Sequence, residues 1–142
     1  MAPREIVAAA QILWELMVDS YRNPLWAAAY LINGGCSDDG FDYFRGWLIV
    51  QGREVFERIV ADPDALADLP AIRAQAPGMA NIECEDTLYI ASMAHRAATG
   101  QELPVGAFTI RYPELDAEWA FDFNNRTEMK RRLPRLAAIC LT

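Results

Sequence analysis

The sequence predicts a mainly α-helical fold, a single-domain helical bundle of about five helices that spans residues 1–142. Apolar residues recur at spacings of three and four in most segments, and Gly and Pro residues separate these segments. Apolar residues alternate only near 105–123, which favours a small β-hairpin or an extended arm there. The chain is 53% hydrophobic and 23% charged, as is typical of an ordered globular domain that needs no disulfide or metal.

The first two helices are predicted from their apolar patterns and their breaks. The first begins near Pro3, because proline is tolerated in the first helical turn. Asn23 precedes Pro24 and is therefore pushed out of helical geometry. The second helix, 24–33, is apolar on nearly all sides, so we expect it in the core. The apolar stripe of the first helix consists of Ile6, Val7, Ala10, Leu13, Trp14 and Met17.

A third helix is predicted to begin after Ser37, a favoured N-cap, and to run to about residue 59. We expect Phe41 and Phe44 on its buried side and Arg45 on its solvent side. Gly46 and Gly52 lie inside this predicted helix, each at a cost of about 1 kcal/mol relative to alanine. Close approach of the backbone to another helix or to a ligand would explain such glycines.

The remaining segments are predicted to be shorter. Residues 62–68 are expected to form a turn and a short helix. Their Asp residues suggest either a calcium loop or a helix cap, and we favour the cap because the central glycine and the final glutamate of a calcium loop are missing. A loop is expected over 73–83, a helix over 84–99, and a terminal helix from Arg126 that is interrupted at Pro134.

Charge and cysteine content limit the classes of partner. The net charge of −7 and the pI near 4.6 argue against nucleic acid and anionic membranes, and favour a basic partner. The basic cluster 126–132 is predicted to be a solvated helix face. Three widely spaced cysteines predict neither a disulfide framework nor a zinc site. Glu5 and Glu15 argue against a secretory signal, so we expect a cytoplasmic protein.

The stretch 34–49 contains the candidate site. Asp38 and Asp42 share one helix face, so they could bind a ligand or a metal, although capping of the helix start is the favoured interpretation. Arg45 can pair with either carboxylate, bind an external anion, or extend from the core into solvent. His95, the only histidine, has no nucleophile in a triad pattern, and no phosphate-binding or zinc-protease motif is present.

A family resemblance rests on residues 25–69. The segment contains a small-residue turn, Ser-Asp-Asp, Phe-Arg-x-Trp-Leu, Gly-Arg and Asp-Pro-Asp, and the C-terminal "RRLPRL" is similar too. These motifs resemble the bacterial domain of unknown function 4240. The resemblance implies a predominantly helical single-domain protein in a bacterial context, and it implies no biochemical activity.

Two functional hypotheses remain open, and neither requires a cofactor or a metal. The first is a non-enzymatic acidic module that engages a protein partner in a regulatory, immunity-like or accessory role. The second is a small-molecule-binding protein or enzyme, with Asp38 or Asp39 as acid or base and Arg45 as an anion clamp. The candidate binding residues are Asp38, Asp39, Asp42, Arg45, Trp26, Tyr30, Tyr43 and Trp47.

Overall fold

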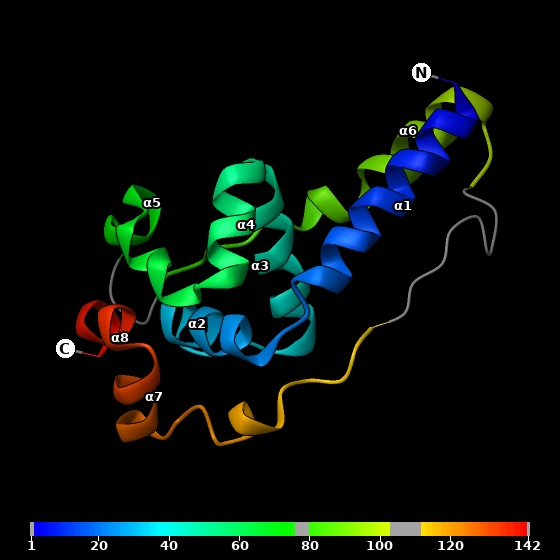
Figure 1. Ribbon diagram of the computed structural model, residues 1–142. Coiled ribbons are helices and arrows are strands. Elements are labelled where there is room, and N and C mark those ends of the chain that lie inside the picture. The colour runs from blue at the N-terminus through cyan, green and yellow to red at the C-terminus, as the bar shows by residue number, and fades with distance from the viewer. Residues whose placement is uncertain (1, 76–79, 103–111, 142) are drawn as a thin grey trace.

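The computed structural model describes residues 2–75, 80–102 and 112–141, and within these ranges it contains helices and no strand. The mainly α fold class is therefore confirmed, with more helices than the five expected (Figure 1). The α-helices are α1 (Pro3–Asp19), α2 (Asn23–Asn33), α3 (Asp38–Val50), α4 (Arg53–Ala61), α5 (Pro70–Arg73), α6 (Ile90–Thr99), α7 (Arg126–Arg132) and α8 (Pro134–Cys140). In the described part of the chain, three 3₁₀ helices accompany them: η1 (Pro63–Asp68), η2 (Glu85–Tyr89) and η3 (Ala117–Trp119).

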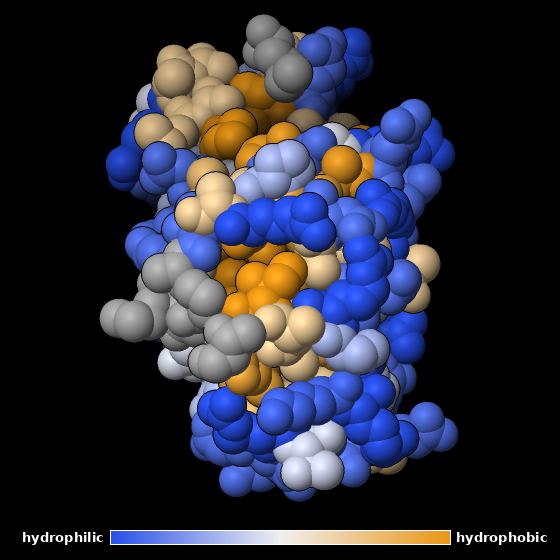
Figure 2. Space-filling model, turned by 90° about the vertical axis from the view of Figure 1, so that its left-hand side faces the viewer, coloured by the Kyte–Doolittle hydropathy of each residue, from blue (hydrophilic) through white to orange (hydrophobic). Residues whose placement is uncertain are grey.

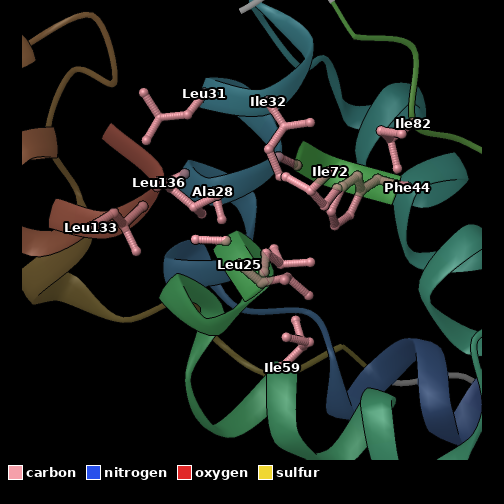
Figure 3. Packing of buried hydrophobic residues seen from close by; sticks show 14 of the residues in the cluster. Leu25, Ala28, Leu31, Ile32, Phe44, Ile59, Ile72, Ile82, Leu133 and Leu136 are labelled. Carbon is pink, nitrogen blue, oxygen red and sulfur yellow. The ribbon is translucent and has the colours of Figure 1, made fainter. Parts of the chain in front are cut away.

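The apolar helix α2 lies in the core, as its sequence predicts. Its Leu25, Ala28 and Ile32 side chains are almost completely buried. Figure 3 shows them between Leu133 and Leu136 on one side and residues of the η1–α5 region and α4 on the other. At the other end of the molecule, α6 packs along α1, and this pair extends away from the core (Figure 1).

The predicted long third helix is wrong in its length. α3 ends at Val50 and α4 begins at Arg53, with Gly52 at a φ of 104° between them. A positive φ favours glycine, so Gly52 separates two helices instead of lying inside one. Gly46 does lie inside α3. A Cβ atom at this position would be 2.5 Å from the main-chain oxygen of Cys84, so Gly46 permits the close approach of a non-helical segment.

The expected hairpin or arm near 105–123 lies partly outside the described residues. Its described part, from residue 112, contains η3 and no strand, and it follows an extended course towards α7 (Figure 1). The main-chain N–H of Asp116 donates a 2.6 Å hydrogen bond to Oδ1 of Asn23, and Asp116 also pairs with Arg22 at 3.1 Å. These contacts attach this segment to the junction between α1 and α2.

The Asp64 and Asp68 carboxylates contact other parts of the fold, and Asp62, at the N-cap of η1, makes no side-chain cap hydrogen bond, so the predicted cap within this segment is wrong. Asp64 accepts hydrogen bonds from the main-chain N–H groups of Arg135, at 3.1 Å, and Leu136, at 2.9 Å. Asp68 pairs with both Arg58 and Arg135.

Figure 2 looks onto the end of the molecule that carries α5 and α8, where an apolar strip is bordered by hydrophilic residues. Within the described ranges, no helix has both the length and the apolar character needed to cross a membrane.

Candidate binding site at the start of α3

The start of α3 is built by a tight turn and a side-chain cap. Gly34 and Gly35 have φ values of 68° and 129°, which L residues with a side chain rarely adopt. Ser37 then accepts a 3.1 Å hydrogen bond from the main-chain N–H of Gly40, so the predicted N-cap is confirmed. The Asp38 and Asp39 side chains lie exposed in the first helical turn, where the helix dipole favours negative charge.

Arg45 lies inside the protein, which corrects its predicted place on the solvent side of the helix. Its side chain has 0% exposure, against 36% for its ion-pair partner Asp42. Nη1 donates to the main-chain oxygen of Met17 at 2.6 Å, Nε donates to that of Phe41 at 3.4 Å, and Nη2 donates to Asp42. The guanidinium therefore has no exposed surface with which to clamp an external anion.

Aromatic rings surround the buried guanidinium. Its carbon lies 4.5 Å from the ring centre of Phe41, 5.2 Å from that of Tyr21 and 5.8 Å from that of Tyr112. Trp26 stacks on Phe41 with the centroids 4.7 Å apart, and its Nε1–H donates to the main-chain oxygen of Cys36 at 2.9 Å. These contacts fix the orientation of the rings before any ligand binds.

An open pocket of about 200 Å³ lies over this cluster, lined by Tyr21, Trp26, Asp38, Asp42 and Tyr112. Among the described residues that line the pocket or lie directly beneath it, two are carboxylates and one is a guanidinium, that of Arg45, so their summed charge is negative. Asp38 forms no ion pair with any residue in the described ranges. Burial raises the pKa of the Tyr112 phenol against the opposing effect of Arg45, so this ring is neutral at pH 7. Negative charge beside aromatic faces suits a cation.

The structure gathers only some of the predicted site residues. Asp38, Asp42 and Trp26 line the pocket, and Arg45 lies beneath it. Tyr30 lines a different cavity. The other predicted residues lie elsewhere on α3 and are absent from the lining of this pocket: Asp39, Tyr43 and Trp47.

The sequence pattern did not identify Tyr21 and Tyr112. Tyr21 follows α1, and Tyr112 belongs to the alternating segment, yet their ring centroids lie 4.7 Å apart. The two residues are too far apart in the sequence for a helical or strand spacing to predict their contact. The burial of Arg45, in contrast, has a local signal: Phe41 lies four residues before it and Leu48 three residues after it, on one buried helix face.

Two other reactive side chains of the chain are the Cys36 thiol, beside the start of α3, and the His95 imidazole. Burial raises the pKa of the Cys36 thiol to about 12, an effect that Arg45 opposes and Asp38 reinforces, so the thiol is protonated at pH 7. His95 lies on α6, where its Nδ1 is 3.0 Å from the main-chain oxygen of Gln101. Across the described ranges, no three His, Cys, Asp or Glu side chains are grouped so that they could hold a metal ion.

Comparisons with known proteins identify a family. Residues 1–97 match the family DUF4240, whose description is a protein of unknown function. The matched region contains α1 to α5 and most of α6, and therefore every pocket residue except Tyr112. No curated protein and no solved structure matches the chain.

Proposed function

The chain belongs to the DUF4240 family, and we propose that it is a non-enzymatic binding module that engages a protein partner through a cationic side chain of that partner. One observation carries the proposal: the pocket combines Asp38 and Asp42 with the rings of Tyr21, Trp26 and Tyr112. Cations bind to aromatic faces, and nearby carboxylates strengthen this binding by charge attraction.

The size of the pocket favours a side chain over a free small molecule. Its volume of about 200 Å³ is below the roughly 300–1,000 Å³ of typical small-molecule sites, so it suits a single ammonium or guanidinium group. One cation–π contact contributes about 0.5–2 kcal/mol, and an exposed ion pair contributes at most about 1 kcal/mol. These energies amount to weak binding, so stable association requires the larger contact area of a protein.

The charge of the molecule supports a basic partner. The net charge is −7, and Asp38 and Asp39 are both exposed at the start of α3. Complementary charge accelerates the encounter of two proteins, and added salt reduces this effect. Arg45 positions the aromatic rings in this proposal, and no acid, base or nucleophile is required.

A peptide titration with matched variants tests the proposal. The ¹⁵N-labelled protein is titrated with acetyl-Gly-Arg-Gly-amide, its lysine analogue and its neutral citrulline analogue. We expect saturable shifts of the Trp26 indole N–H with at least one cationic peptide, at roughly millimolar Kd, and weaker binding of citrulline. Asp38→Asn should weaken binding about threefold, whereas Asp39→Asn, an adjacent exposed carboxylate outside the pocket, should change it less.

Two results would overturn the proposal. One is the absence of a saturable shift for both cationic peptides. The other is equal binding of the citrulline peptide, which would show that charge is not recognised. Retention of a small molecule through purification, detected by native mass spectrometry and lost in Asp38→Asn, would instead support the small-molecule hypothesis.

A further inference from the structure

We infer that a second cavity, between the end of α2 and the α7–α8 region, binds a small monocarboxylate that carries an apolar or aromatic group. The cavity has a volume of about 330 Å³, at the lower end of the range for small-molecule sites. Its polar lining comes from Tyr30, Asn124 and Arg126, and its apolar lining includes Leu31, Phe123 and Leu141. The inference is independent of the proposed function, because the two pockets share no residue.

Arg126 supplies the positive charge. Its Nη2 donates to the main-chain oxygen of Leu141 at 3.1 Å, and it forms no ion pair with any residue that the structure describes. Arg131 and Arg132, in the same basic cluster, both pair with Glu128. A guanidinium has five N–H donors, and the contacts among the described residues leave most of those on Arg126 for a ligand. Arg126 is exposed, as the sequence predicts for the basic cluster 126–132, and it also lines the cavity.

Asn124 supplies a second donor. The Tyr30 hydroxyl donates a 2.8 Å hydrogen bond to Oδ1 of Asn124. This bond uses the amide oxygen, so the Nδ2 hydrogens can donate to a ligand. A carboxylate has two oxygens that accept from neighbouring donors, and it can therefore bridge the Asn124 amide and the Arg126 guanidinium.

The apolar lining determines the rest of the ligand. The Phe123 ring meets Tyr30 edge to face, with the centroids 5.7 Å apart and the planes at 66°. Together with Leu31 and Leu141 it provides an apolar surface next to the two donors. The net charge of −7 opposes multiply charged anions, and the one guanidinium in the described lining matches one negative charge. A monocarboxylate with a small apolar group fits both conditions.

The test is an NMR titration of the full ¹⁵N-labelled chain with sodium benzoate and sodium hexanoate. Benzamide serves as the neutral isostere of benzoate, and inorganic phosphate serves as an anion without an apolar group. We expect saturable shifts of the Asn124 side-chain amide and the Arg126 Nε–H with at least one carboxylate. Benzamide and phosphate should bind at least tenfold more weakly than that carboxylate.

Three variants make the test specific. Arg126→Gln should weaken carboxylate binding at least tenfold, and Arg126→Lys should weaken it less, because charge is kept while the planar fork is lost. Lys130→Gln removes an exposed charge from the same cluster but outside the cavity, and should leave binding unchanged. Equal binding of benzamide or phosphate, no saturable shift with either carboxylate, or equal losses in Arg126→Gln and Lys130→Gln would overturn the inference.

Discussion

Nη1 of Arg45 donates a 2.6 Å hydrogen bond to the main-chain oxygen of Met17, which joins the middle of α3 to the end of α1. The last carbonyl groups of a helix have no partner within the helix, so this bond satisfies one of them. Ser20 Oγ donates to the same oxygen at 3.2 Å. The buried Arg45 guanidinium thus connects two helices and packs against the Tyr21 and Tyr112 rings, which line the pocket.

Replacement of Arg45 should destabilise the fold. Arg45→Met leaves the Met17 oxygen with fewer donors and removes the charge partner of Asp42. Loss of one member of a buried pair costs about 3–5 kcal/mol, and because Asp42 is partly solvated we expect about 2–4 kcal/mol. Urea unfolding measures this change. Arg53→Met breaks the exposed pair with Glu57 and should cost at most about 1 kcal/mol. Equal losses in the two variants would contradict the role assigned to Arg45.

Gly46→Ala should also destabilise the protein, although alanine is the better helix former. The new Cβ would lie 2.5 Å from the Cys84 oxygen and 3.3 Å from Cβ of Thr87, so α3 and the segment before η2 must separate. We expect a loss of about 1–3 kcal/mol. Gly40→Ala is the control on the same helix, because its closest neighbour is the Ser37 Oγ at 3.3 Å, and it should cost less than about 1 kcal/mol. Thermal unfolding of both variants distinguishes packing from helix propensity.

Asp64→Ala should weaken the start of α8. The Asp64 carboxylate accepts from the N–H groups of Arg135 and Leu136, and loss of a helix cap costs about 0.5–2 kcal/mol. Hydrogen exchange of the Leu136 amide should become faster. Asp62→Ala is the matched control, since Asp62 makes no side-chain cap. Unchanged exchange at Leu136 in Asp64→Ala would show that the cap does not hold in solution.

The ion pairs of Glu128 should make stability depend on pH. Hydrogen bonds from Arg131 and Arg132 lower the pKa of Glu128 from 4.5 to about 2. A lowered folded-state pKa stabilises the protein fully above the unfolded value, and this stabilisation is lost as the pH falls from 4.5 towards 2. The difference in unfolding free energy between wild type and Glu128→Gln should therefore be constant near pH 7 and shrink below pH 4.5. A difference that is the same at pH 7 and pH 3 would contradict this assignment.

Local chemistry in the sequence determined the helix starts and stops. Asn23, which the sequence predicts to lie outside helical geometry, is instead the first residue of α2, and Pro24 lies in the first turn of that helix. Gly34 ends α2, Ser37 caps α3, and Pro134 begins α8. Each of these effects depends on residues within a few positions, so the sequence pattern is sufficient to predict them. The net negative charge of the protein follows from its composition, and the core position of α2 follows from the apolar pattern of that helix.

The tertiary structure alone decided what those helices bring together. Arg45 is buried because an oxygen 28 residues earlier accepts its hydrogen bond and rings from other segments surround it. Gly46 meets Cys84, and Asp64 caps a helix that begins at Pro134, for the same reason. Such partners are set by the folded path of the chain and not by spacing along it. Of the eight candidate residues that the sequence predicted, Asp38, Asp42 and Trp26 line the pocket, and only the fold adds Tyr21 and Tyr112 to them.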